Sequence, residues 1–152
     1  MPIEAKLNEL GIIIPEASKP VASYVPAVKT GNLIFVSGQL PVVAGHLKYK
    51  GILGRDMDTS AGYDAARICA INCLAAIKTV EPDLNKIVKI VKVTGFVNSV
   101  SDSGDQPKVI NGASELLEKI FGEKGKHARA AIGMSGLPLG ALVEVEMIVE
   151  VE

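Results

Sequence analysis

The chain has 152 residues, of which 48% are hydrophobic and 4% are aromatic, and its 16 basic and 17 acidic side chains leave a net charge of −1. It therefore lacks the basic stripe and stacking rings typical of nucleic-acid binders, and no apolar run approaches the ~18 residues of a membrane-spanning helix. With a mean hydropathy of +0.31, one domain over residues 1–152 is expected, with other copies of the chain covering part of its apolar surface. The first residues lack the layout of a signal peptide, so a cytoplasmic protein with no membrane partner is expected.

The first third of the chain predicts a helix, an extended connection and a β-hairpin. A proline in the first turn and a glycine just past the end favour a helix over residues 2–10. Prolines then punctuate an extension to residue 20. Strands are predicted at residues 24–29 and 33–37 around a Thr-Gly-Asn turn, and a short strand at residues 47–49.

The middle of the chain predicts two helices separated by a strand. Small residues recur at helical spacing over residues 61–80, after the possible cap Asp58. Cys69 and Cys73 lie four apart on that helix, but two thiols alone do not complete a metal site, so buried core residues are predicted. A β-branched strand follows at residues 87–97, and an amphipathic helix at residues 107–121 ends before Gly122.

Two strands, at residues 128–134 and 142–151, complete the prediction. The second alternates strictly between apolar residues and mostly glutamates, which is typical of a strand with one buried face. The order of elements favours an α+β fold with a mixed sheet and both helices on one face. Only other subunits remain to cover the opposite face.

Few residues in this pattern carry obvious chemistry. Arg129, the single charge of its strand, and Glu144 on the next strand are compatible with an anion-binding and proton-handling pair, but an exposed ion pair is the commoner explanation of such residues. Ser37 lies outside a nucleophile-elbow motif and has no evident His–acid partner, so a hydrogen bond to a ligand or to the backbone is the better interpretation. His127, two residues before Arg129, is interpreted as structural.

Three stretches resemble the Rid family (reactive intermediate deaminases, also called the YjgF family and formerly endoribonuclease L-PSP). They are GNLIFVSGQLP at residues 31–41, ARAA at residues 128–131 and VEVE at residues 143–146. The resemblance runs from about residue 24 to residue 151. It implies a chorismate-mutase-like fold and a homotrimer whose sheets form an inner barrel, with ligand clefts between subunits.

The resemblance also implies an activity and a set of site residues. Family members hydrolyse reactive 2-imino or enamine acids, such as 2-iminopropanoate, to 2-oxo acids and ammonia, and they need no metal or cofactor. By match to the family, Arg129 would bind the substrate carboxylate and Glu144 would activate water. The remaining matched positions would line the cleft with side chains or backbone groups: Tyr24, Ser37, Gly38, Asn111 and Ala131.

The sequence also departs from this pattern, which leaves other functions open. Ala131 stands where many family members carry a cysteine. The helix and extension over residues 1–20 and the glycine-containing segment at residues 46–58 are additional, and the latter could reshape the mouth of the cleft. A non-catalytic protein that binds 2-oxo acids in the same cleft is therefore the main alternative. A ribonuclease is disfavoured, because the chain has just two histidines and no basic stripe.

Overall fold

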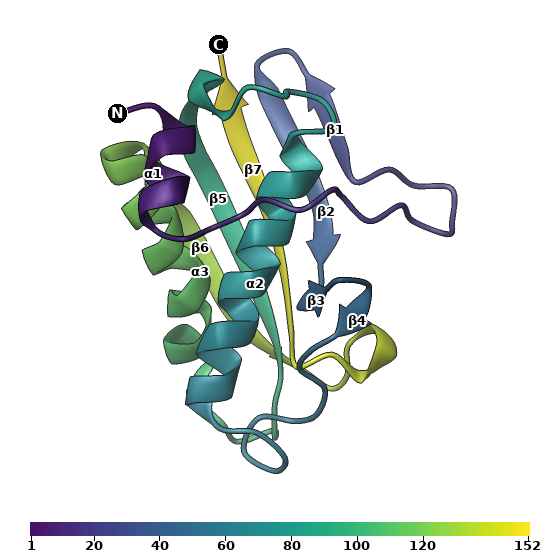
Figure 1. Cartoon of the computed structure of the whole chain (residues 1–152). Helices are drawn as coiled ribbons and strands as arrows, with labels where there is room; N and C mark the ends of the chain where they lie inside the picture. The colour runs from purple at the N-terminus through teal and green to yellow at the C-terminus, as the bar shows by residue number, and fades with distance from the viewer.

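Alternating side chains build a five-stranded sheet in the computed structural model, which describes residues 1–152. In spatial order the strands are β1 (Ala27–Thr30), β2 (Leu33–Gln39), β7 (Val143–Val151), β5 (Ile87–Asn98) and β6 (Ala128–Met134). Neighbours run antiparallel except β5 and β6, which are parallel. The sheet is therefore mixed, as predicted, with β7 at its centre (Figure 1).

Two long helices cover one face of this sheet (Figure 1). Helix α2 (Thr59–Ile77) begins where the Asp58 side chain accepts a hydrogen bond from the Ala61 N–H at 2.9 Å. Helix α3 (Gln106–Phe121) ends at Gly122, whose positive φ of 63° favours glycine. Cys69 and Cys73 are fully buried between α2 and the sheet, which confirms their prediction as core residues. None of the helices is both long and apolar enough to cross a lipid bilayer.

The two helices touch through a glycine. A Cβ placed on Gly112 of α3 would overlap the backbone carbonyl of Tyr63 on α2, so only a residue without a side chain allows this approach. The same holds where α3 crosses β5, because a Cβ on Gly95 would overlap the Ile110 side chain. These contacts fix the position of α3 against both neighbouring elements.

The alternation of β7 sorts its side chains as predicted. Its valines and Met147 are buried beneath the helices, whereas Glu144, Glu146, Ile148 and Glu150 lie on the other face. No element of this chain covers that second face, which we call the open face. It exposes the apolar side chains of Val28, Phe35 and Ile132. The prediction that helices cover only one side of the sheet is therefore confirmed.

The N-terminal region adds a third helix to the helical layer. Helix α1 (Ile3–Glu9) contacts α3, and the chain then crosses α2 on its way to β1 (Figure 1). Leu7 and Ile12 are buried in the main core. Helix α1 and Ile12 thus pack against the main core, whereas most of residues 13–20 are exposed.

The segment between β2 and α2 departs most from the prediction. A short hairpin of β3 (Val42–Val43) and β4 (His46–Leu47) replaces the single strand expected at residues 47–49, because Ala44 and Gly45 both adopt positive φ and form a tight turn. Short 3₁₀ helices add turns elsewhere, at Leu84–Lys86, Gly122–Gly125 and Pro138–Gly140.

The ends of two other elements also differ from the prediction. Helix α2 ends at Ile77, three residues before the predicted end, and β1 begins only at Ala27.

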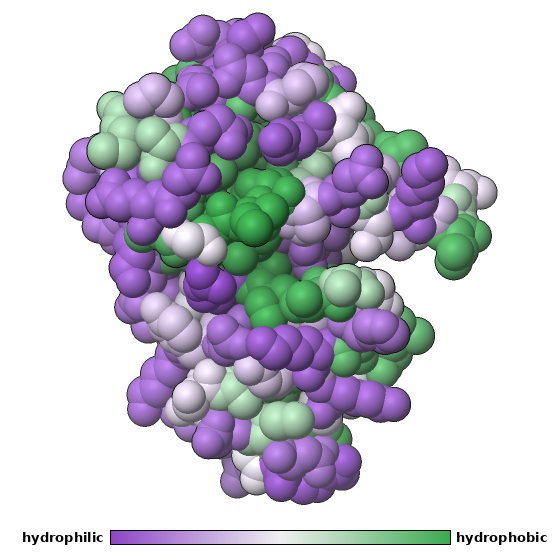
Figure 2. Space-filling model, viewed as in Figure 1, coloured by the Kyte–Doolittle hydropathy of each residue, from purple (hydrophilic) through white to green (hydrophobic).

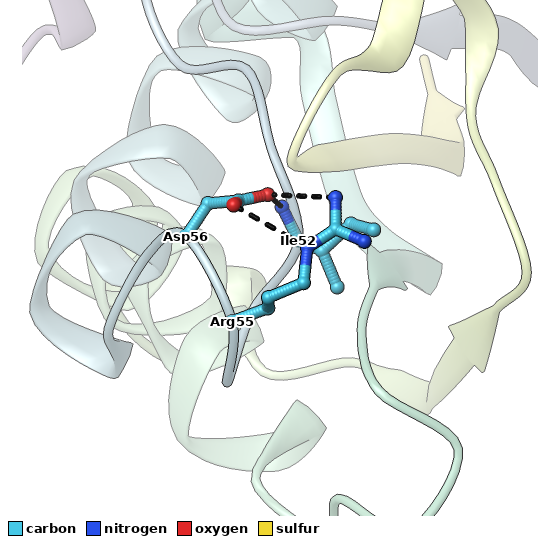
Figure 3. Close-up of polar contacts among 3 residues, drawn as sticks. All are labelled: Ile52, Arg55 and Asp56. Atoms are coloured by element: carbon cyan, nitrogen blue, oxygen red, sulfur yellow. Dashed lines mark hydrogen bonds and ion pairs between the residues drawn. The ribbon is translucent and has the colours of Figure 1, made fainter.

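The loop that follows this hairpin is held by its own side chains. The Asp56 carboxylate accepts a hydrogen bond from the Ile52 N–H at 2.9 Å and pairs with the Arg55 guanidinium at 3.3 Å (Figure 3). Leu53 is buried, and its N–H donates to the Asn98 carbonyl at 2.8 Å. The loop is therefore fastened to the end of β5.

Candidate functional site

Arg129 lies on edge strand β6 and faces α3. Its register partner on β5 is Val93, which is wholly buried on the helix-covered face of the sheet. The guanidinium Nη1 donates hydrogen bonds to Asn111 Oδ1 at 2.8 Å and to Ser114 Oγ at 3.2 Å. Asn111 and Ser114 are three residues apart on α3 and so present their side chains on one face of it.

Ser114 is in turn held by His127. The Ser114 Oγ lies 2.8 Å from His127 Nε2, and His127 Nδ1 lies 2.6 Å from the Gly125 carbonyl oxygen. Because a carbonyl only accepts, Nδ1 carries the proton, and Nε2 of the neutral ring accepts from the Ser114 hydroxyl. Burial lowers the pKa of His127. The hydrogen bond to Gly125 raises this pKa, and the positive charge of Arg129 lowers it further. The neutral ring thus turns the Ser114 lone pairs toward Arg129.

This arrangement leaves one edge of the guanidinium free. Arginine has five N–H donors, and both on Nη1 are engaged, so the adjacent donors on Nη2 and Nε remain. Arg129 forms no ion pair with a carboxylate of its own chain. Two parallel donors match the two oxygens of a carboxylate, a geometry that lysine cannot reproduce. Ala131, whose register partner is Gly95, lies two residues farther along the same edge strand.

Glu144 belongs to a second group of predicted site residues, near the end of β2. It pairs with Phe96 on the open face. An ideal Cβ on Gly38 would stand 2.5 Å from Glu144 Oε2, so the glycine allows the carboxylate to lie against β2. Burial raises the pKa of Glu144, and the negative charge of Glu146 raises it further. A half-buried carboxyl with a raised pKa exchanges its proton at less acidic pH than an exposed one does.

Ser37 and Tyr24 lie close to Gly38. The Ser37 hydroxyl donates to the Val25 carbonyl at 2.6 Å, so its hydrogen is committed to the backbone. This is the hydrogen bond to the backbone that was one of the two roles expected for Ser37. Tyr24 is 59% exposed and, with Gly38, lines a hollow of about 230 Å³.

The structure therefore divides the predicted residues into two half-sites. The arginine half-site comprises Arg129, Asn111 and Ala131, and the glutamate half-site comprises Glu144, Gly38, Ser37 and Tyr24. Arg129 faces the helices and Glu144 lies on the open face, so the two side chains of one chain lie on opposite sides of the sheet. That the two half-sites act together stays a prediction, and such a combined site requires a second copy of the chain.

Sequence reasoning missed Ser114 and underrated His127. The signal was present as two spacings: Asn111 and Ser114 share a helix face, and His127 and Arg129 share a strand face. What the sequence could not supply was the parallel register of β6 on β5, which places these two faces together. No three His, Cys, Asp or Glu side chains of the chain come together as metal ligands.

A two-layer α+β protein with a mixed sheet, two long helices on one face and an arginine fixed at the sheet edge is the class that this fold and site define. The family model described as "YjgF/chorismate_mutase-like, putative endoribonuclease" matches residues 4–151. The chain therefore belongs to the YjgF family, as its motifs predicted.

Individual relatives extend over nearly the whole chain. Protein TCP17 of Trypanosoma cruzi is 41% identical over 151 residues, which cover 97% of this chain and 93% of that protein. The crystal structure of Atu1372 from Agrobacterium tumefaciens, a protein of unknown function, is 47% identical with a TM-score of 0.92 and covers 99% of this chain and 92% of its own. A 2-iminobutanoate/2-iminopropanoate deaminase of Dermatophagoides farinae is 29% identical, covering 93% of this chain and 95% of that protein.

Proposed function

We propose that this chain binds small 2-imino and 2-oxo acids through Arg129 and hydrolyses the imines to 2-oxo acids and ammonia. The observation that carries the proposal is the guanidinium, fixed at Nη1 by Asn111 and Ser114 with its other edge free. A 2-imino acid has a planar carboxylate next to its C=N carbon. Bidentate binding of that carboxylate therefore also positions the reacting carbon.

Glu144 is proposed to move the protons of this reaction. Water adds to the imine carbon and gives a carbinolamine, which loses ammonia and leaves a C=O bond. Glu144 takes a proton from the attacking water and passes it to the imine nitrogen, and it then takes the hydroxyl proton of the carbinolamine and passes it to the same nitrogen, which leaves as ammonia. Its pKa, raised by burial, suits both steps, because the carboxyl group exchanges its proton at less acidic pH than an exposed one.

The complete site is proposed to form between subunits of a homotrimer. Since Arg129 and Glu144 lie on opposite faces of the sheet in one chain, the arginine half-site of one subunit must meet the glutamate half-site of another. Such an assembly also covers the apolar side chains of the open face, including Val28, Phe35 and Ile132. Light scattering should give a mass three times the 16.0 kDa of one chain.

The relatives support this proposal to different degrees. The Dermatophagoides farinae protein carries the name of an imine deaminase, at 29% identity over most of both chains. The names of Protein TCP17 and Atu1372, which are more similar, state no activity, and a structure from Shewanella oneidensis at 34% identity carries the words "putative endoribonuclease". The proposal therefore depends chiefly on the geometry of Arg129.

The activity can be tested with imine generated in place. A pyridoxal-phosphate serine dehydratase supplies the unstable imine, and the rate of pyruvate release is measured with and without this protein. The wild-type chain should accelerate release, and Arg129→Ala should abolish the acceleration. Arg55→Ala removes an exposed arginine from the loop of Figure 3 and serves as the matched control. Equal rates for wild type and Arg129→Ala would refute the assignment.

A non-catalytic binding protein is the second candidate. This function needs only the free edge of Arg129, which suffices to hold a 2-oxo acid. Catalysis also needs Glu144, and no hydrogen bond orients that side chain. Saturable binding of 2-oxobutanoate without any imine turnover would establish this function instead. A ribonuclease finds no such support, because both ring nitrogens of His127 are engaged and His46 lies exposed on the β3–β4 hairpin.

A further inference from the structure

A separate hollow lies on the outer side of α2, away from Arg129. It has a volume of about 370 Å³ and is bounded by α2, the β3–β4 hairpin and residues 13–18 of the N-terminal connection. Figure 2 shows hydrophobic residues gathered where the connection and the hairpin approach each other over α2. Its apolar walls are formed by Ile13, Val42, Val43, Ile68 and Ile71.

The walls of this hollow are held in place by specific contacts. The Asn72 side-chain amide on α2 donates to the Leu40 carbonyl at 2.9 Å and to the Val42 carbonyl at 3.0 Å. These bonds fasten the base of the hairpin to the helix. Ile12, next to the wall residue Ile13, is buried in the core and anchors the connection. The wall formed by α2 and the hairpin is therefore fixed, whereas Ile13 on the facing connection is 89% exposed.

Two of the four charged side chains in the hollow already compensate each other. The Asp64 carboxylate pairs with Lys48 Nζ at 3.6 Å and accepts a hydrogen bond from the Tyr49 hydroxyl at 2.6 Å. Arg67, half-buried one turn along α2, forms no ion pair and no side-chain hydrogen bond. Glu16, on the opposite wall, is likewise unpaired. One positive and one negative charge thus remain beside an aliphatic surface.

We infer that this hollow is a second small-molecule site whose ligand is an α-amino acid with an aliphatic side chain. Its carboxylate would pair with Arg67 and its ammonium with Glu16, while its side chain would cover the apolar wall. An aliphatic carboxylate alone would leave Glu16 unpaired beside an added negative charge, and an amine alone would face Arg67. Of the three, a zwitterion is the ligand that can pair with both side chains at once.

Titration calorimetry of the full chain with L-leucine tests this inference. Two truncated probes share its side chain: 4-methylpentanoate lacks the ammonium, and 3-methylbutylamine lacks the carboxylate. L-leucine should bind saturably at millimolar concentration, and each truncated probe at least about tenfold more weakly, because each loses one charge-assisted pair. L-alanine, which keeps both charges, should also bind more weakly, because it covers less of the apolar wall. Equal affinities of L-leucine and 4-methylpentanoate would overturn the zwitterion assignment.

Variants of the two charged residues locate the site. Arg67→Ala should weaken L-leucine binding by about tenfold or more, and Arg55→Ala, an equal loss of charge at an exposed position, should leave it unchanged. Because Arg67 is half-buried, its replacement could also disturb folding. Glu16 is exposed on the connection, so Glu16→Gln preserves the fold, and it should weaken L-leucine binding but not 4-methylpentanoate binding. Unchanged L-leucine affinity in Glu16→Gln would overturn the inference.

The Arg129→Ala variant separates this site from the proposed catalytic one. It should bind L-leucine as the wild type does while losing imine hydrolysis. If Arg129→Ala abolishes L-leucine binding, the ligand occupies the arginine half-site and the inference is wrong, whatever becomes of the proposed reaction. If imine hydrolysis fails in all proteins but L-leucine still binds through Arg67, only the proposed function is lost.

Discussion

Arg129 and Glu144 are held by the same chain in opposite ways. The Arg129 guanidinium is fixed by two hydrogen bonds from its own chain, and Ser114 and His127 extend that network to the Gly125 carbonyl. The Glu144 carboxylate accepts no side-chain hydrogen bond and is placed by burial and by its approach to Gly38. The Arg129 guanidinium is therefore oriented before any ligand arrives, whereas the Glu144 carboxylate can still change its orientation.

This contrast assigns the two proposed tasks, carboxylate binding and proton transfer, to separate half-sites that would meet in one cleft. Under the proposed function, binding would depend on a network complete within one chain, and proton transfer would depend on a carboxyl group that meets this network only in an assembly. The half-sites should therefore fail independently when they are altered. They should also complement one another when they are carried by different copies of the chain.

The largest effect is expected from mixing two inactive variants. Arg129→Ala and Glu144→Gln should each lose imine hydrolysis by about a hundredfold or more, because each removes a reacting or positioning group. When the two chains are unfolded together and refolded as mixed oligomers, about a quarter of the clefts should combine both intact half-sites, given random assembly around a symmetric ring. The measurement is ammonia release by the mixture against each variant refolded alone.

The control for this mixture is the double variant refolded with Arg129→Ala, which contains no intact arginine half-site. It should stay inactive. Failure of the first mixture to exceed its parents, although mass measurements show mixed oligomers, would mean that one site does not span two chains.

A smaller effect is expected when only the glutamate half-site is distorted. A methyl group in Gly38→Ala would stand 2.5 Å from Glu144 Oε2 and displace the carboxylate. Turnover should fall by about ten- to a hundredfold, since a displacement near 1 Å can cost that much, while affinity for 2-oxobutanoate changes little. Gly136→Ala is the matched control, because no atom lies within 4 Å of the added methyl group. A change in affinity with unchanged turnover would contradict the division of tasks.

Removing a hydrogen bond that orients Arg129 should weaken ligand binding. Ser114→Ala removes one of the two acceptors of Arg129 Nη1 and the donor to His127 Nε2. Affinity for 2-oxobutanoate should fall about three- to tenfold, the usual range for a lost hydrogen bond of about 1 kcal/mol. Calorimetry compares it with Ser101→Ala, which alters an exposed turn. If both serine variants bind alike, Ser114 does not orient Arg129.

The smallest effect concerns the acidic limb of the activity profile. The proposed hydrolysis needs an ionised Glu144, whose pKa is raised by burial and further by Glu146. Activity should therefore fall at higher pH than an ordinary glutamate with a pKa near ~4.3 predicts. Glu146→Gln removes the like charge and should move the limb of kcat/KM to lower pH, while burial keeps it above the ordinary value. Glu150→Gln, farther along the same face of β7, should move it less.

The sequence predicted most of the fold because its elements are local. Strand β6 and helix α3 begin and end within a residue of their predicted positions, and the alternation of β7 assigned both of its faces. The β3–β4 hairpin was missed, because strands of two residues leave no periodic pattern and the turn at Ala44 uses a conformation that alanine rarely adopts.

The candidate site was harder to predict. Arg129 and Glu144 were found from motifs, but their placement on opposite faces depends on the register of β6, and residues 128–134 show no alternation that would fix it. Ser114 supports Arg129 only because α3 lies beside β6, a contact between elements that the sequence does not encode locally. The outer hollow likewise depends on where the N-terminal connection crosses α2.

The glycine contact between α2 and α3 has a consequence for the evolution of this protein. Gly112 stands between Asn111 and Ser114 on α3 and touches the carbonyl of Tyr63 on the side turned away from Arg129. Any larger residue at 112 would push the helix outward and carry both guanidinium acceptors with it. Position 112, which no substrate contacts, thus limits the substitutions that evolution can tolerate. A mutation there would remove the proposed activity although every side chain proposed to contact the ligand is unchanged.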